Sequence, residues 1–170
     1  MAETYEIIST QTLGTAIADV FFTSIPQTYT DLVAVVQTRT ADAGAYGNLG
    51  VRCNSLSTNI YSRTYVVGNG TSAISGRNTA GSFSYLGGTT GASATAGVLA
   101  IYTINFMNYS NTSTFKTVLS RATNPVLQAE AAVTLIQTTN AISSINLLTA
   151  SGANFAVGST FTLYGIKAAA

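Results

Sequence analysis

Side chains that could carry out chemistry are scarce in this sequence. The 170 residues include no histidine, no tryptophan and one cysteine, with seven Lys+Arg and six Asp+Glu. Acid–base and nucleophilic catalysis near neutral pH depend mostly on histidine, paired carboxylates or activated thiols. The composition therefore argues against an enzyme. We expect no catalytic residue, no metal site and no cofactor.

The carboxylates offer one candidate pair. The acidic residues are Glu3, Glu6, Asp19, Asp31, Asp42 and Glu130. Asp19 and Asp31 flank the turn at Ile25-Pro26, so a hairpin could bring them near each other. Two neighbouring carboxylates could in principle serve glycoside hydrolysis. The alternative is that both are exposed charges that block strand addition at an edge. We favour the second interpretation, because such hydrolases usually also present tryptophan to the sugar.

The remaining chemical signals are weak. Cys53 has no partner for a disulfide and no histidine to activate it, which indicates a buried structural thiol. The glycine clusters at Gly68-Asn69-Gly70 and Gly87-Gly88 resemble only fragments of phosphate-binding loops, because neither precedes a Lys-Ser/Thr pair. The cations considered for a basic stripe are Arg52, Arg63, Arg77, Lys116 and Arg121. They are scattered, so we expect solubilising or interface charges and no nucleic-acid partner.

Bulk composition favours one domain that works inside an assembly. Charged residues make up 8% of the chain, against roughly 25% in ordinary globular proteins. A net charge of +1 gives little protection against association. A soluble monomer hydrated by hydroxyl groups is the alternative. The acidic start, Met1–Glu6, lacks an apolar stretch, and no apolar run approaches the roughly 20 residues that span a bilayer. We therefore expect synthesis in a cytoplasm and no membrane partner.

Short β-branched or aromatic runs recur along the chain, separated by Gly, Asn, Ser or Pro. The predicted strands are Tyr5–Leu13, Ile17–Thr23, Asp31–Arg39, Leu49–Cys53, Tyr61–Val67, Ser82–Leu86, Val98–Asn108, Phe115–Ala122, Leu127–Gln137, Ile142–Leu148 and Ser159–Ile166. Many short strands at this spacing are typical of an antiparallel sandwich or barrel. No domain boundary or internal repeat is visible, so residues 1–170 are predicted to form a single domain.

Period-2 alternation supports the strand assignment. In Val98–Asn108, one face carries Val98, Ala100, Tyr102, Ile104 and Phe106, which predicts a half-buried strand. Asp31–Arg39 is apolar on both faces, which indicates a central strand or one covered by a partner. Leu127–Ile136 could also form a helix, but its flanks favour a strand.

Two further segments complete the chain. Gly87–Gly97 lacks bulk, charge and periodicity and is predicted to be a loop. In Ser159–Ile166, Phe161 and Leu163 alternate with polar residues, which predicts a last strand inside the sheet. Residues 167–170 are predicted to be a frayed tail.

Tyrosines are the best candidates for contact residues. A tyrosine ring has an apolar body and a polar tip, which suits interfaces. We select Tyr29, Tyr46, Tyr61 and Tyr109 as candidate interface residues.

Several segments resemble a β-rich virion-protein domain of tailed bacteriophages, including phages of cyanobacteria and marine bacteria. They are Phe22–Val33, Asn108–Asn111, Lys116–Ser120 and Asn154–Ile166. The resemblance spans essentially the whole chain, and its motifs are structural. The sequence departs from the pattern by having no tryptophan in its C-terminal third, which puts sugar binding further in doubt.

The resemblance implies an all-β, jelly-roll-like sandwich and a structural role. The expected role is a capsid decoration, or cement, protein on the outer capsid surface of the virion. Its expected partners are the major capsid protein and further copies of itself, as a homotrimer in preference to a dimer. The alternative is a tail-fibre or tail-tip adhesin module that binds host surface glycans.

Overall fold

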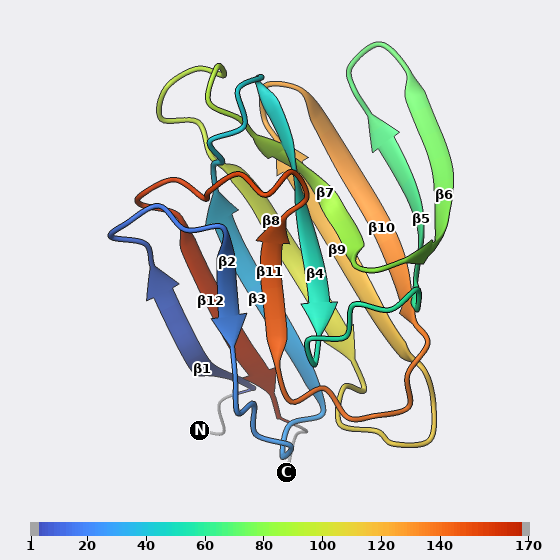
Figure 1. Ribbon diagram of the computed structural model, residues 1–170. Coiled ribbons are helices and arrows are strands. Elements are labelled where there is room, and N and C mark those ends of the chain that lie inside the picture. Colours follow the sequence, from blue (N-terminus) through green and yellow to red (C-terminus); the bar gives the residue numbers. More distant parts are fainter. Residues whose placement is uncertain (1–3, 168–170) are drawn as a thin grey trace.

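The computed structural model describes residues 4–167, and within that range the chain forms twelve β-strands and no helix (Figure 1). The strands are β1 (Tyr5–Thr12), β2 (Asp19–Phe22), β3 (Asp31–Thr38), β4 (Tyr46–Cys53), β5 (Tyr61–Gly68), β6 (Ala73–Gly81), β7 (Ser84–Thr90), β8 (Ala100–Met107), β9 (Lys116–Asn124), β10 (Gln128–Ile136), β11 (Ile145–Thr149) and β12 (Thr160–Ile166). None of the described segments is a helix that could cross a membrane.

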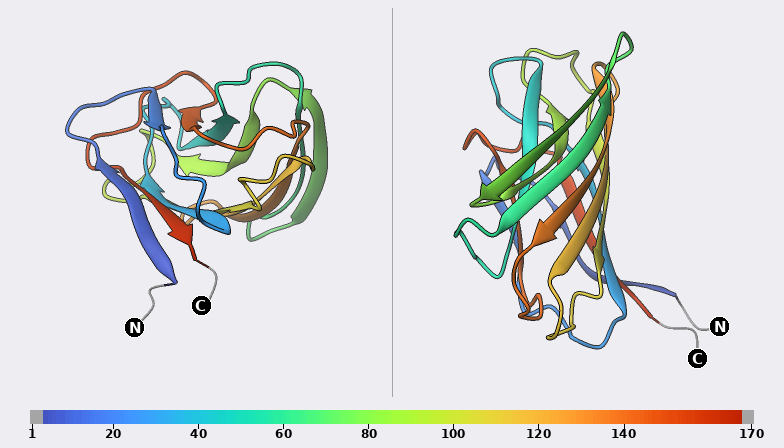
Figure 2. Two further views of the ribbon diagram at one scale, coloured as in Figure 1. Left: turned by 90° about the horizontal axis from the view of Figure 1, so that it is seen from below. Right: turned by 90° about the vertical axis from the view of Figure 1, so that its right-hand side faces the viewer.

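The strands form two antiparallel sheets packed face to face, which confirms the predicted all-β sandwich. The larger sheet has eight strands in the order β1-β12-β3-β8-β9-β10-β5-β6, and the smaller has four in the order β2-β11-β4-β7. The larger sheet curves around the smaller one (Figure 2). Jelly rolls have eight strands in two Greek keys, so the jelly-roll connectivity stays a prediction here.

The core lies between the sheets and follows the alternation of the sequence. In β8, Ala100, Tyr102, Ile104 and Phe106 are all fully buried. Strand β3 lies centrally in the larger sheet, between β12 and β8, as its apolar sequence predicts. Its outward-facing Val33 is also buried, although it points away from the core. The second apolar face of β3 is therefore largely covered within one chain, and by itself it does not require a partner.

The sequence prediction missed one strand and truncated two others: β7, and β4, which begins at Tyr46 and not at Leu49. Strand β6 was not predicted, and its residues are almost all exposed on both faces. The predicted loop at Gly87–Gly97 is wrong over its first part, because Gly87–Thr90 belongs to β7. Only residues 91–97 form the loop, and the guanidinium of Arg39 holds it by donating to the carbonyls of Ala92, Ala94 and Thr95.

The C-terminal strand is integral to the larger sheet. β12 pairs with β1 on one side and β3 on the other, and the fully buried Phe161 packs edge-on against Phe155 at a centroid distance of 5.0 Å. The predicted fraying at Lys167 is wrong: its amide donates to the carbonyl of Thr4 at 3.0 Å, and its ammonium pairs with Glu6 at 2.6 Å. Residues 168–170 of that prediction lie outside the described range.

Three of the four segments quoted for the resemblance, Phe22–Val33, Asn108–Asn111 and Asn154–Ile166, meet at one corner of the sandwich. A Cβ added at Gly165 would lie 2.4 Å from the ring of Tyr29, so this glycine lets the ring pack directly on β12. The Tyr109 hydroxyl donates to the carbonyl of Pro26 and accepts from the Tyr29 amide at 3.4 Å. Tyr29 and Tyr109 therefore join the segment before β3 to β12 and to the segment that follows β8.

Candidate functional site

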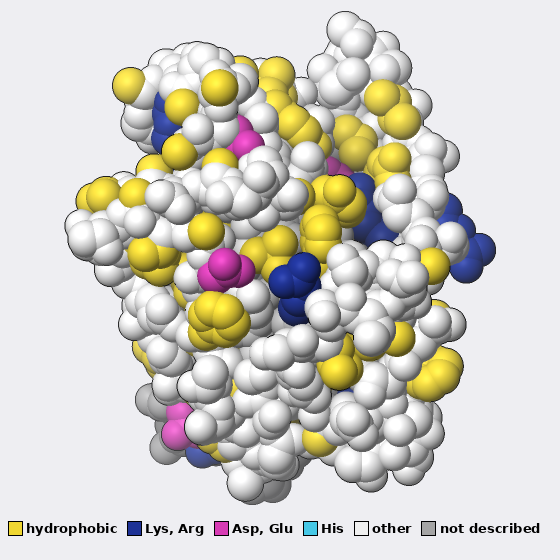
Figure 3. Space-filling model, viewed as in Figure 1, with side chains coloured by type: hydrophobic (Ala, Val, Ile, Leu, Met, Phe, Trp, Pro, Cys, Tyr) yellow, Lys and Arg dark blue, Asp and Glu magenta, His cyan; other side chains and the backbone are white. Residues whose placement is uncertain are grey.

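The most distinctive surface feature is a cleft where the larger sheet extends past the smaller one. Eight strands face four, so the inner face of β5 and β6 is left without a full covering layer. Figure 3 shows a hollow between the β5–β6 hairpin and the body of the molecule, with charged side chains among apolar ones. The cleft has a volume of about 400 Å³, within the range of about 300–1,000 Å³ that is usual for small-molecule sites.

Three walls contribute to the cleft. The inner faces of β5 and β6 supply Arg63, Tyr65, Val67, Ile74 and Asn78. The smaller sheet supplies Tyr46, Asn48 and Tyr85, and β10 supplies Gln128 and Glu130. The lining thus combines tyrosine rings, side-chain amides and one ion pair.

The ion pair joins Arg63 to Glu130 and is buried. Arg63 Nη2 lies 2.6 Å from Glu130 Oε1, and the two side chains are 8% and 2% exposed. The other carboxylate oxygen accepts from the amide of Gly88 at 3.1 Å and from Gln128 Nε2 at 3.0 Å. Glu130 is therefore fully engaged inside the protein, whereas the buried Arg63 Nε makes no hydrogen bond within the described chain.

Tyrosine rings flank the guanidinium. The Arg63 carbon lies 4.0 Å from the centroid of Tyr65 and 5.6 Å from that of Tyr85, within the roughly 6 Å reach of cation–π attraction. The ring of Tyr65 packs on β6 because Gly76 has no side chain; a Cβ there would lie 2.5 Å from the Tyr65 hydroxyl. Close packing therefore defines where this ring lies.

Tyr46 forms part of the opposite wall. A Cβ at Gly88 would lie 2.4 Å from the Tyr46 ring, so this glycine makes room for it. The Tyr46 hydroxyl donates to Asn48 Oδ1 at 2.7 Å. Burial, followed by the nearby Glu130 charge, raises the pKa of Tyr46, so it stays protonated at neutral pH and can donate hydrogen bonds. Its side chain is 39% exposed and accessible to a ligand.

The described lining of the cleft contains a single carboxylate. That carboxylate belongs to Glu130, and glycoside hydrolysis needs two. Within residues 4–167 there is also no cluster of three His, Cys, Asp or Glu side chains that could hold a metal. The arrangement provides rings and hydrogen-bonding groups for recognition.

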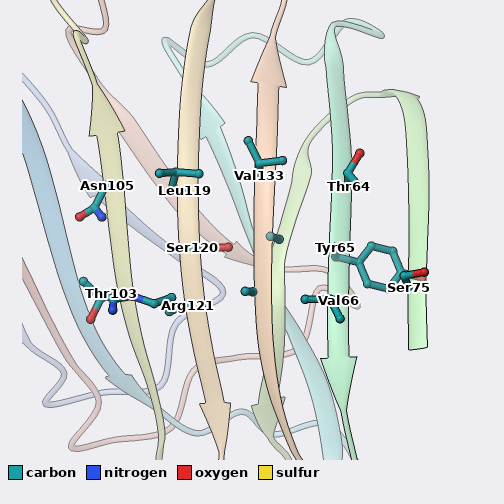
Figure 4. A pocket seen from close by; sticks show the side chains of 12 residues that line it. Thr64, Tyr65, Val66, Ser75, Thr103, Asn105, Leu119, Ser120, Arg121 and Val133 are labelled. Atoms are coloured by element: carbon teal, nitrogen blue, oxygen red, sulfur yellow. The ribbon is translucent and has the colours of Figure 1, made fainter. Parts of the chain in front are cut away.

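A second feature is the outer face of the larger sheet, which is broad and poorly charged. One row of side chains crosses it in register: Ile7, Tyr164, Val33, Asn105, Leu119, Val133, Thr64 and Arg77. Leu119 and Val133 are about 40% exposed although both are large and apolar. Figure 4 shows them side by side on β9 and β10, with Arg121 extending toward Thr103 on β8.

This face also has a shallow groove over the small side chain of Ala131. Leu119, Val133, Val66 and Arg121 are among the residues that border it. Flat apolar area with a few polar groups is the composition of many protein–protein interfaces. The outer face is therefore suited to lie against another protein surface.

The four tyrosines selected from the sequence separate into two groups. Tyr46 lies in the cleft, and Tyr29 is half-buried at the motif corner. Tyr61 and Tyr109 were wrong as surface contacts, because both are buried. Their positions beside loops suggested exposure, but their hydroxyls fix those loops: Tyr61 donates to the carbonyl of Leu56 at 2.9 Å and accepts from the Cys53 amide.

Asp19 and Asp31, considered as a candidate pair but favoured as edge charges, do not form a hairpin site. Asp19 lies on β2 of the smaller sheet, where it accepts from Asn146 at 3.0 Å, and Asp31 lies on β3 of the larger sheet, where it accepts from the Asn108 amide at 2.5 Å. Asp19 occupies an edge strand as expected, whereas β3 is central.

Cys53 is fully buried as predicted, and burial raises the pKa of its thiol to about 12.

Two of the scattered cations are not surface charges. Arg63 belongs to the buried ion pair, and Lys116 is buried with its ammonium donating to the carbonyls of Asn111, Thr114 and Thr139. Sequence reasoning also missed Glu130 as a site residue. The available signal was a charge at an inward position of an alternating strand, since Glu130 shares its face with Ala132 and Thr134.

No family model, curated protein or solved structure matches this chain.

Proposed function

We propose that this chain is a non-enzymatic structural protein of a tailed-phage virion, most consistent with a jelly-roll-like capsid decoration protein. The observation that supports this role is the outer face of the eight-stranded sheet, with apolar side chains in register across neighbouring strands and few charges. Such a face can bury apolar and uncharged polar area against a flat protein surface. The phage assignment itself depends on the sequence resemblance.

The proposed partner is the major capsid protein in its assembled lattice. A module that binds the assembled shell and not its free subunits stabilises the shell through linkage. Leu119 and Val133 lie near the middle of the outer face and are its proposed anchors, because fully covered apolar residues near the centre of an interface contribute most to binding. The protein would then lie on the outer surface of the virion.

Self-association is part of the proposal, as a homotrimer in preference to a dimer. A chain with 8% charged residues has little electrostatic protection against association. Light scattering at micromolar concentration tests this, with a stable monomer mass as the contrary result. Leu119→Lys should leave a trimer intact if the outer face meets only the capsid, and should dissociate it if copies meet through that face.

The proposed role is tested by locating the protein on particles. Antibody-labelled virions in negative stain should show abundant label over the head, and quantitative mass spectrometry should give a copy number comparable to that of the major capsid protein. Label confined to the tail, at low copy number, would instead support the adhesin alternative.

A matched pair of variants tests the binding face. Leu119→Lys should abolish co-sedimentation with heads that lack the protein. Phe21→Lys, which alters an exposed aromatic on β2 of the opposite sheet, should not. Equal retention of both variants on heads would reject the outer face as the docking surface.

A further inference from the structure

We propose that the cleft between the β5–β6 hairpin and the smaller sheet is a binding site for a neutral sugar, a pyranose residue at the end of a glycan. This inference is independent of the outer face and of capsid binding. It rests on the chemistry of the lining residues: tyrosine rings, side-chain amides and a neutralised ion pair in one concave site.

The electrostatics of the cleft favour an uncharged ligand. Arg63 is neutralised by Glu130 at 2.6 Å, so an anion would compete with an internal carboxylate and face its charge. A cation would gain little, because the Glu130 oxygens already accept from Arg63, Gly88 and Gln128. Neither type of charged ligand meets an unpaired opposite charge there.

The polar groups favour a hydroxyl-rich ligand over an apolar one. Asn48, Asn78 and Gln128 place side-chain amides along the cleft, and an amide can donate and accept at once. An apolar ligand would strip water from these groups without replacing their hydrogen bonds, which is unfavourable.

The rings supply the complementary apolar surface. A pyranose has apolar C–H faces and a polar rim, and an aromatic ring can pack against such a face. Tyr65 and Tyr85 both lie within cation–π reach of the Arg63 guanidinium, and Tyr46 also lines the cleft. Gly76 and Gly88 make room for two of these rings. Tyrosine here takes the place of the tryptophan that the sequence lacks.

The direct test is saturation-transfer-difference NMR on the full chain. The probes are glucose, galactose, mannose and N-acetylglucosamine, with glucuronic acid and sialic acid as charged comparisons. We expect at least one neutral sugar to receive saturation, with a dissociation constant in the millimolar range for a ligand of this size. The acidic sugars should bind more weakly. No transfer to any neutral sugar at about 50 mM would overturn the proposal.

Variants locate the site. Tyr65→Ala should weaken binding of the best neutral sugar about tenfold or more by removing one ring surface. Asn78→Ala changes an exposed residue of β6 and should weaken binding without unfolding the chain, which guards against a destabilised Tyr65 variant. Tyr5→Ala, an exposed tyrosine on β1 at the opposite edge of the sheet, should leave binding unchanged. Unchanged binding in both cleft variants, or equal loss with Tyr5→Ala, would refute this location.

Discussion

At the residue scale, the pair between Arg63 and Glu130 is the buried one of the two ion pairs found among the described residues. Its two side chains are nearly inaccessible, so solvent screens them little. Removing one partner of a buried pair leaves the other charge without compensation, which typically costs about 3–5 kcal/mol. The pair therefore matters to stability even though its net contribution, relative to an apolar pair, can be small.

We predict that Glu130→Gln lowers the free energy of unfolding by about 3–5 kcal/mol. Arg63→Met should have a smaller cost, because the remaining carboxylate still accepts from Gly88 and Gln128. The double variant should cost less than the sum of the two by about 1–3 kcal/mol. Urea denaturation measures all three, with the exposed Arg77→Met as a control expected to stay within about 0.5 kcal/mol of the parent. Strict additivity would mean that the two charges do not interact.

Several buried acidic groups make the free energy of unfolding depend on pH in the alkaline range, and Cys53 and Tyr61 are two of them. Burial raises the pKa of the Cys53 thiol to about 12, and burial is also the main cause that raises the pKa of Tyr61 to about 12. In the unfolded chain these groups ionise near about 8.5 and 10. Because the folded pKa is the higher one, the folded state holds the proton more tightly. The contribution of these two groups to the free energy of unfolding is fully present below their pKa values in the unfolded chain. It is lost as the pH rises toward 12.

We predict a nearly constant free energy of unfolding between about pH 6 and 8, where this chain has no histidine to titrate. Above about pH 8.5 for Cys53 and about pH 10 for Tyr61, each group should remove up to about 1.4 kcal/mol per pH unit. Cys53→Ala should make that alkaline slope shallower. The same slope in the parent and in Cys53→Ala would show that the thiol is not protected by burial.

At the scale of elements, β12 joins the edge strand β1 to the rest of the larger sheet. It is the strand between β1 and β3, and Phe161 is its largest buried side chain. We predict that Phe161→Ala costs about 3–5 kcal/mol, as other large-to-small core changes do. Thr160→Ala, at a half-buried position on the same strand, should cost much less. A melting temperature unchanged by Phe161→Ala, or proteolysis that removes residues 159–167 without unfolding the rest, would contradict the placement.

Alternation made most strands predictable, and its absence explains the failures. β8 and β12 each bury one face, so their apolar residues recur with a period of two. β6 buries neither face, so its sequence has no such pattern. The hairpin turn at Gly68-Asn69-Gly70 is the one sequence signal that predicts this strand. In β7, glycine suggested a loop, yet Gly88 is needed where the Tyr46 ring crosses the strand.

The cleft could not be predicted from sequence because it depends on the difference between two sheets. Strand pairing over long separations places Tyr46, Arg63 and Glu130 together. The alternation of each strand indicates which side chains point inward, but not that the smaller sheet stops before covering β5 and β6. Tyr61 was misassigned for a related reason: burial of a tyrosine beside a loop depends on whether its hydroxyl finds a partner, as it does at Leu56.

At the scale of the whole molecule, few charges are available for long-range electrostatic attraction to a partner. Exposed ion pairs contribute little and are screened by salt. We predict that attachment to heads changes less than about threefold in affinity between low and high sodium chloride. Co-sedimentation at the two salt concentrations measures it. A many-fold loss at high salt would show that Arg77 and Arg121 on the outer face contribute more than its apolar side chains.

The pairing of β1 with β12 has a consequence for the order of the chain. The amide of Lys167 bonds to the carbonyl of Thr4, so both described ends emerge side by side (Figure 2). Joining them with a short linker and opening the chain in the loop of residues 91–97 would give a circular permutant with every strand pairing retained. In that permutant β8 would become the first strand and β7 the last, while Tyr46, Arg63 and Glu130 would still meet. The cleft depends on how the strands are arranged in space and does not depend on where the polypeptide chain starts.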